Sequence, residues 1–214
     1  MVSLAYRRLI QWSFERLYRE FAWTYDAVAA AVSGGLWRRW TLSAIPELRG
    51  RVLELGSGTG YVQLALADRP RVAGLDASPQ MARLAARRVA RVGHRPRVVC
   101  GLAQVLPFPA ASFDSVLATF PAPYILDPRT HAEIRRVLAP GGRLVLVPLA
   151  QLDESPYTRM VDWLYRLTLQ APVRRRTPAY PALATLQIPG LHLTPRWVPV
   201  GPSRALLLVG ERSG

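Results

Sequence analysis

Three glycines near residue 56 carry the strongest chemical signal in this chain of 214 residues. Gly56, Gly58 and Gly60 follow an apolar stretch at 52–55 and come directly before a helical pattern. Glycine lets the backbone approach a ligand closely, and the free amide groups at the start of a helix favour a carboxylate or a phosphate. The stretch therefore predicts a ligand-binding turn between a strand and a helix.

The spacing of these glycines separates the turn from two other nucleotide-binding loops. A dinucleotide-binding turn has the spacing G-x-G-x-x-G. Here the spacing is G-x-G-x-G, and Tyr61 stands where the last glycine of that motif would be. A P-loop requires a Lys, and the chain contains none, which excludes a P-loop.

Asp76 is the second signal, because it ends the next apolar stretch 20 residues after Gly56. A carboxylate at this point of an α/β fold can accept hydrogen bonds from both hydroxyls of a ribose. Its alternative role is that of a negative charge at a helix N-terminus, which contributes about 0.3–1 kcal/mol. The glycine turn upstream favours the ribose role.

Short apolar stretches alternate with helical patterns from residue 51 onward, and these elements must position the turn and Asp76. Helices are expected at 61–67, after Ser78 and after Asp127, since each of the last two precedes a Pro and can act as an N-cap. Pro140-Gly141-Gly142 is expected to end the last of these helices. Strands are predicted at 51–55, 71–75, 97–100, 113–119 and 144–147. This alternation predicts an α/β fold with a doubly wound, mostly parallel sheet.

The two ends of the chain follow other patterns. Residues 3–25 predict an amphipathic helix, so that residues 1–50 would form a helical cap on the ligand-binding half at 51–150. In the last part, 151–214, we expect an acceptor-side helix and two closing strands, which bring the sheet to seven strands. The helix is predicted at Ser155–Gln170 and the strands at His192–Val200 and Arg204–Val209. A chain of this length is expected to form a single domain, 1–214.

The motifs resemble those of the class I S-adenosylmethionine-dependent methyltransferases, in the methyltransferase type 11 group that includes the quinone-biosynthesis C-methyltransferases. Glu54–Gly60 is similar to the first motif of the family, and Gly74–Met81 to the second. Leu106–Pro109 with Ser112–Asp114 matches the stretch before the fourth strand, and Arg136–Leu144 the approach to the fifth. The resemblance implies a Rossmann-like fold with S-adenosylmethionine as cofactor.

The resemblance also implies roles for individual residues. Gly56, Gly58 and the backbone around them would hold the methionine end of the cofactor, and Asp76 would hold its ribose. Glu54 would orient the turn or contact the amino group of the methionine part. The complete set of expected cofactor residues is Tyr25, Glu54, Gly56, Ser57, Gly58, Gly60, Asp76, Ala77, Met81, Leu102, Ala103 and Thr119.

One departure from the family concerns the adenine. Ala77 and Met81 would flank the adenine ring, and Leu102-Ala103 would lie along its edge. Relatives commonly have Gly-Asp-Ala where this chain has Gly101-Leu102-Ala103. The acid that would accept from the adenine amino group is therefore missing, unless Gln104 takes its place.

The resemblance says less about the methyl acceptor. Phe120 and Tyr124 follow the fourth strand, where they would line an apolar acceptor pocket or pack as ordinary loop residues. A methyl group on a cationic sulfur is already activated, so the enzyme mainly aligns the reactants. No catalytic residue is assigned, and His131 and Tyr124 are weak candidates. Asp127 is expected to be a helix cap rather than a base.

The sequence indicates no metal site, because His94, His131 and His192 are scattered and Cys100 is the single Cys. The expected function is methyl transfer to a small-molecule or lipid-like acceptor. The alternatives are methylation of RNA or protein, or a non-catalytic cofactor-binding accessory subunit. Residues 120–124 lack the Asn or Asp that base-amino methyltransferases carry there, which makes nucleic acid the less favoured acceptor.

Charge is the most unusual feature of the composition. All 28 basic residues are Arg, against 14 acidic residues, and the net charge is +14. This excess follows from compositional bias or from contact with an anionic partner such as membrane or RNA. Arg83, Arg87 and Arg91 form a basic stripe on a predicted helix, and Arg88, Arg95 and Arg97 add to it. The stripe is either a solvated face or such a contact.

Two further features bear on localisation. A lone Cys cannot form an internal disulfide and favours a reducing compartment. No apolar stretch is long enough to span a membrane, and the N-terminus lacks the pattern of a signal peptide. A cytoplasmic location is expected, with peripheral contact with anionic membrane as an additional hypothesis. The sequence does not indicate an oligomeric state.

Overall fold

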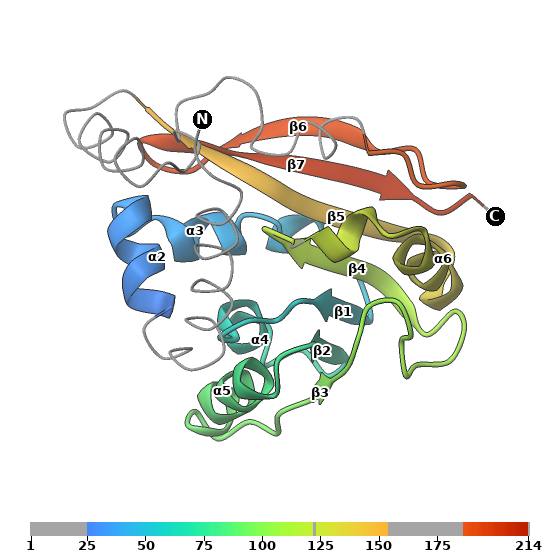
Figure 1. Cartoon of the computed structure of the whole chain (residues 1–214), viewed down its shortest axis with the longest axis horizontal. Helices are drawn as coiled ribbons and strands as arrows, with labels where there is room; N and C mark the ends of the chain where they lie inside the picture. The colour runs from blue at the N-terminus through green and yellow to red at the C-terminus, as the bar shows by residue number, and fades with distance from the viewer. Residues whose placement is uncertain (1–24, 122, 154–185, 214) are drawn as a thin grey trace, which may run out of the picture.

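The computed structural model describes residues 25–121, 123–153 and 186–213. Its centre is a seven-stranded sheet with the order β3-β2-β1-β4-β5-β7-β6 (Figure 1). The predicted helix at Ser155–Gln170 and all but the last residue of the predicted helix at 3–25 lie outside the described residues. The mostly parallel, seven-stranded α/β sheet expected from the sequence is confirmed.

Five strands of the sheet run parallel to one another. β1 pairs with β2 on one side and with β4 on the other, β2 pairs with β3, and β4 pairs with β5. Parallel neighbours need crossover connections, and three of these contain a helix. In the connection from β3 to β4 the described chain forms no helix. The parallel strands are β1 Val52–Leu55, β2 Val72–Asp76, β3 Val98–Cys100, β4 Phe113–Thr119 and β5 Leu138–Leu152.

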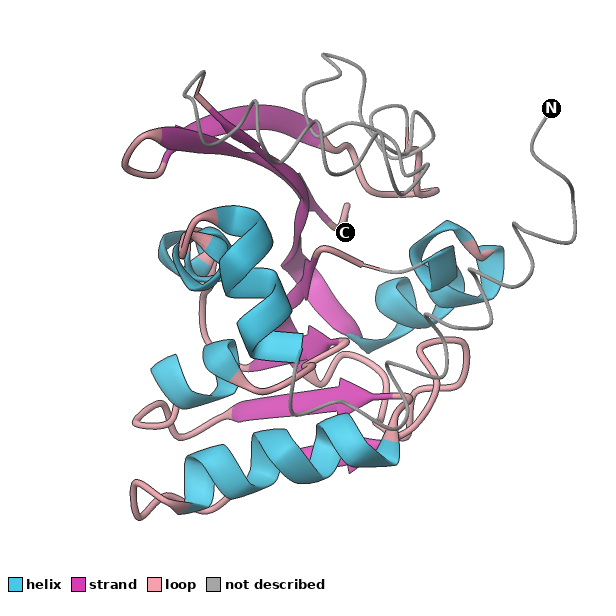
Figure 2. Cartoon of the chain, turned by 60° about the vertical axis from the view of Figure 1, so that its left-hand side comes forward, coloured by secondary structure: helices cyan, strands magenta, loops and turns pink. Residues whose placement is uncertain are grey.

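Helices cover both faces of this sheet, as Figure 2 shows from the side. On one face Ile134 and Val137 of α6 belong to the same core cluster as Leu53 of β1. On the other face Val62 of α4 packs against Val52, and α5 lies against α4, β2 and β3. The three helices are α4 Tyr61–Ala65, α5 Pro79–Ala90 and α6 Pro128–Val137.

The helices α5 and α6 begin where their capping residues predict. The Ser78 hydroxyl accepts a hydrogen bond from the Met81 amide at 3.4 Å. The Asp127 carboxylate accepts from the Arg129 amide at 2.9 Å, and a Pro follows each cap. The capping role expected for Asp127 is thereby confirmed.

The start of β5 corrects one prediction. Helix α6 ends at Val137, because Leu138 takes extended dihedrals (φ −68°, ψ 135°) and pairs with Phe113 of β4. Pro140-Gly141-Gly142 therefore lies inside the first part of β5, and the prediction that it ends the helix was wrong. The register of β5 against β4 shifts in this part, so β5 has an irregular start before its regular pairing at Arg143.

Two antiparallel strands complete the sheet. β7 (Ser203–Glu211) runs antiparallel to both β5 and β6 (Thr194–Pro199). Their positions agree with the closing strands predicted at 192–200 and 204–209. No helix in the described part of the chain is long and apolar enough to cross a membrane.

The described part of the cap packs on the sheet through the helix at Trp37–Leu42. α2 (Tyr25–Ser33) and α3 (Trp37–Leu42) are followed by the short helix η1 (Ile45–Glu47). The side chain of Trp40 is buried, and its Nε1 donates a hydrogen bond to the Ser203 hydroxyl at 2.9 Å. This contact fastens α3 to the start of β7.

Ser203→Ala should lower the free energy of unfolding by about 1–3 kcal/mol, because it leaves the buried Trp40 N–H without its partner. Urea unfolding of the full chain measures this loss. Ser213→Ala, at an exposed position, serves as the control. Equal stability of the two variants would contradict the role given to the Trp40–Ser203 contact.

Candidate functional site

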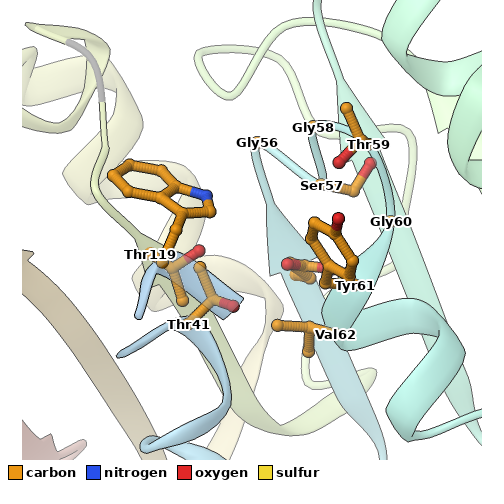
Figure 3. Close-up of a pocket in the computed structure, with 11 residues that line it drawn as sticks. Thr41, Gly56, Ser57, Gly58, Thr59, Gly60, Tyr61, Val62 and Thr119 are labelled. Carbon is orange, nitrogen blue, oxygen red and sulfur yellow. The ribbon is translucent and has the colours of Figure 1, made fainter. Parts of the chain in front are cut away.

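A pocket lies between the glycine turn and helix α3 of the cap (Figure 3). The turn follows the carboxyl end of β1, and Thr119 reaches the pocket from the end of the neighbouring strand β4. This position is where α/β sheets bind their ligands. The described lining residues are Trp37, Thr41, Glu54, Gly56, Ser57, Gly58, Thr59, Gly60, Tyr61, Val62 and Thr119.

The turn depends on glycine at two positions in different ways. Gly58 has a φ of +51°, and a Cβ there would have no atom within 4 Å, so open space lies above the backbone. Gly60 has a φ of +84°, and a Cβ there would come within 2.6 Å of the Ala85 Cα of α5. The first glycine leaves room for a ligand, and the second lets α5 pack directly against the turn.

Asp76 holds the turn from the end of β2. One of its carboxylate oxygens accepts a hydrogen bond from the Gly58 amide at 2.7 Å, and the other accepts from the Ser78 amide at 2.8 Å. Partial burial raises the pKa of Asp76, and the two backbone hydrogen bonds oppose that rise. The carboxylate thus connects the glycine turn to the start of α5, and its ribose role stays a prediction.

Glu54 places a buried carboxyl group in the wall of the pocket. Its side chain is 1% exposed, and Gln63 Nε2 donates a hydrogen bond to it at 2.7 Å. Burial raises its pKa to about 8, and the Gln63 amide opposes the rise. No described cation pairs with Glu54, so a cationic ligand in the pocket would favour its ionised form.

A polar network that the sequence did not reveal fastens α2 to the turn. Arg88 of α5 donates to the Asp26 carboxylate at 2.5 Å and to the Thr59 hydroxyl at 3.2 Å. The Thr59 hydroxyl in turn donates to Asp26 at 2.7 Å. The Arg88 guanidinium also lies over the Tyr61 ring, 4.0 Å from its centroid. Burial raises the pKa of Tyr61, and the negative charge of Asp26 adds to the rise.

No sequence signal could have found this network. Asp26 and Arg88 are 62 residues apart, and each belongs to a helix whose charged residues are expected to face solvent. Only the packing of α5 against the turn brings them together.

The expected cofactor residues divide into two groups in the structure. Six of them line the pocket together, and Asp76 bonds to the turn that forms its wall. The residues expected at the adenine are not among those that line it: Met81 and Ala103 are buried, Ala77 is exposed, and Leu102 is 57% exposed. The six pocket residues are Glu54, Gly56, Ser57, Gly58, Gly60 and Thr119.

Two further residues are expected near the cofactor, and neither is among the described residues that line the pocket. Tyr25 begins α2, and its side chain lies outside the described part of the structure. Gln104, which could replace the missing acid at the adenine, donates a hydrogen bond to Asp127 at 3.3 Å.

The weak catalytic candidates have structural partners instead of a place in the pocket wall. The Tyr124 hydroxyl donates to the Leu55 carbonyl at 3.0 Å, and burial raises the pKa of Tyr124. His131 is buried, with Nε2 2.7 Å from the Ile125 carbonyl. A catalytic role for either residue stays a prediction that these contacts do not support.

With this geometry in place, the chain can be compared with known proteins. A methyltransferase domain family matches residues 53–146. A demethylmenaquinone methyltransferase from Thermobifida fusca is 33% identical over 160 residues, which cover 72% of this chain and 68% of that relative. The chain belongs to the class I S-adenosylmethionine-dependent methyltransferases. The resemblance noted from the motifs is confirmed.

Two other matches are limited, one in the share of the relative that is covered and the other in sequence identity. A ubiquinone/menaquinone biosynthesis C-methyltransferase from Geobacter sulfurreducens is 33% identical over 160 residues, but the chain spans only 61% of that relative. A solved methyltransferase structure from Thermotoga maritima, described as a possible histamine N-methyltransferase, has a TM-score of 0.60 at 20% identity. That match covers 92% of this chain and 99% of the other. At this identity the structural match supports the fold alone.

The pocket residues fit S-adenosylmethionine, the cofactor of the family. The Ser57 hydroxyl is buried and has no hydrogen-bond partner among the described residues, so it is available to a ligand. Gly58 leaves open space above the turn, and the Glu54 carboxyl suits the positive charge of the cofactor. Glu54, Ser57 and the turn would hold its methionine end, with Asp76 beside them.

The buried carboxyl of Glu54 should make stability depend on pH. The pKa is about 8 in the folded protein and 4.5 for an ordinary Glu, so between these values the folded state keeps a proton that the unfolded state releases. The free energy of unfolding should therefore fall as pH rises, by up to about 1.4 kcal/mol per pH unit. Urea unfolding at several pH values measures the slope. Glu54→Gln should remove this contribution, and an unchanged slope in that variant would refute the assignment.

Arg88→Met should weaken S-adenosylmethionine binding about 10-fold, which corresponds to one lost hydrogen bond. The reason is that Arg88 holds Thr59 of the turn and Asp26 of α2. Calorimetric titration gives the affinity. Arg87→Met is the matched control, since Arg87 is the preceding residue and is exposed. Equal affinities in the two variants would show that the network does not support the turn.

Proposed function

We propose that the chain transfers the methyl group of S-adenosylmethionine to a ring carbon of a lipid-like quinol. Family membership supports the methyl transfer. The quinol acceptor is suggested by relatives that are named as demethylmenaquinone and ubiquinone/menaquinone C-methyltransferases. The observation that carries the proposal is an aromatic pair, which we call the aromatic wall: Trp37 lines the pocket, and Phe120 stacks on it.

One residue of the aromatic wall, Phe120, has an unusual backbone conformation. Trp37 of α3 lines the pocket, and its ring stacks on that of Phe120 with centroids 4.3 Å apart and an interplanar angle of 26°. Phe120 directly follows Thr119 and has a φ of +45°. A positive φ is strained for such a bulky residue, and strain of this kind gathers at functional sites. A planar, apolar acceptor ring matches such a surface.

The pocket offers few groups that could remove a proton. Among its described lining residues, only Glu54 and Tyr61 titrate. The cofactor, when bound, supplies a methyl group already activated on a cationic sulfur. The residues of the chain then align the acceptor and exclude water, which is the main catalytic requirement for such a reaction. A quinol suits this pocket, because its own hydroxyl groups make the ring carbon nucleophilic.

Incubation of the full chain with labelled S-adenosylmethionine and a reduced demethylated naphthoquinone tests the proposal. Label should appear in the extracted quinone, on carbon. A parallel incubation with fractionated cell extract covers the alternatives from the sequence. Label in the RNA or protein fraction, but not in lipid, would overturn the acceptor assignment, and no label in any fraction would favour a non-catalytic accessory subunit.

Phe120→Leu should raise the KM for the quinol about 2- to 10-fold, because it removes the ring on which the pocket residue Trp37 stacks, which is worth about one aromatic contact. Affinity for S-adenosylmethionine should stay unchanged, because Phe120 is not among the described residues that line the pocket. Steady-state kinetics and calorimetry separate these two effects. Phe108→Leu is the control, since Phe108 packs edge-on against Phe113 in the other core cluster. A loss of cofactor affinity in Phe120→Leu would contradict the role of Phe120 in acceptor binding.

A further inference from the structure

Five of the ten acidic side chains in the described structure are paired with arginines that lie away from α5. Arg51 pairs with Asp114 at 2.9 Å, and Arg136 pairs with Glu133 at 2.6 Å. Glu47 and Glu211 both bind Arg143, at 3.2 Å and 2.7 Å. The positive charge of these paired arginines is therefore neutralised locally.

The outer face of α5 gathers several arginines that have no acidic partner in the described part of the chain. Arg83, Arg87 and Arg91 are exposed and have no hydrogen-bond or ion-pair partner among residues 25–121, 123–153 and 186–213. Their spacing of four residues places them in one stripe about 12 Å long. The opposite face of the helix is buried through Met81, Ala82, Ala85 and Val89.

The sequence around the stripe adds positive charge and little negative charge. No Asp or Glu occurs between Asp76 and Asp114. Arg95 follows the stripe, exposed and also without a described partner. Among the described residues, Asp26 pairs with Arg88 of the same helix, and Asp68 lies 3.2 Å from His94 Nε2. The surface formed by Arg83, Arg87, Arg91 and Arg95, which we call the α5 basic face, is thus strongly cationic.

The position and apolar content of this face indicate the kind of partner. In both Figure 1 and Figure 2, α5 lies at the β3 end of the molecule, away from β6 and β7. Val92 follows Arg91 directly and is 53% exposed, so an apolar side chain lies among the arginines. Arginines around an exposed apolar side chain match the charge and the apolar interior of an anionic lipid surface.

We propose that the α5 basic face docks the protein on anionic membrane. The choice of lipid over nucleic acid rests in part on the proposed function, because a lipid-like acceptor resides in the bilayer. The helix that carries this face begins at Ser78, whose amide is bonded to Asp76 of the site. Because the opposite face of α5 packs on the turn through Ala85, docking would hold the cofactor turn about one helix diameter, ~10 Å, from the membrane surface.

Vesicle sedimentation with the full chain tests the docking. Wild type should bind equimolar phosphatidylcholine–phosphatidylglycerol vesicles much more strongly than pure phosphatidylcholine. Each Arg near an anionic surface contributes about fivefold. The triple variant Arg83→Gln/Arg87→Gln/Arg91→Gln should therefore bind about 100-fold more weakly.

A charge-matched variant distinguishes binding through the α5 basic face from binding that depends only on the net charge of the protein. Arg39→Gln/Arg135→Gln/Arg204→Gln removes three exposed arginines from other elements, so both triple variants fall from a net charge of +14 to +11. Binding should remain close to wild type in this control. Equal losses in the two triple variants, or equal binding of wild type to neutral and anionic vesicles, would overturn the proposal.

Two further measurements complete the test. Binding of single-stranded RNA that is steeply salt-dependent and is lost in the α5 variant, without vesicle binding, would assign the face to nucleic acid instead. Methylation of a water-soluble, short-chain quinol should be unchanged in both triple variants. If that methylation is absent from wild type while vesicle binding persists, the proposed function fails and the docking surface stands.

Discussion

The hydrogen bond between the Gly58 amide and the Asp76 carboxylate is the contact on which the rest of the site depends. It joins the ends of β1 and β2, and the same carboxylate holds the start of α5 through the Ser78 amide. Because Gly60 has no side chain, α5 can then pack against the turn at Ala85. The shape of the pocket wall is therefore set before any ligand binds, which reduces the cost of ordering the turn around one.

The elements and the pocket motif could be predicted from the sequence because they depend on local signals. Apolar alternation, the Pro residues after Ser78 and Asp127, and the glycine spacing each act within a few residues. The start of β5 could not be predicted in this way. A Pro-Gly-Gly run usually ends a helix, but here the pairing of Leu138 with Phe113 had already ended it, and that pairing is a tertiary contact.

The site shows the same division between local and tertiary information. Six expected residues share the pocket because they belong to one turn or to strands adjacent to it. The network of Asp26, Thr59 and Arg88 was missed, because side chains so far apart in sequence leave no periodic signal. Trp37 was also missed as a pocket residue. It belongs to the cap, and helical periodicity does not show which part of a cap faces a ligand.

The cap is attached to the rest of the protein at two places, one on the sheet and one at the turn. Trp40 fastens α3 to Ser203 of β7, while Arg88 fastens α2 to the opposite side, at the turn. Trp37 lies on α3, which is also in contact with α4, the helix that directly follows the turn. Arg38 of α3 lies over the Tyr61 ring of α4, 5.8 Å from its centroid. The position of Trp37 in the pocket therefore depends both on the sheet and on the helix that continues the glycine turn.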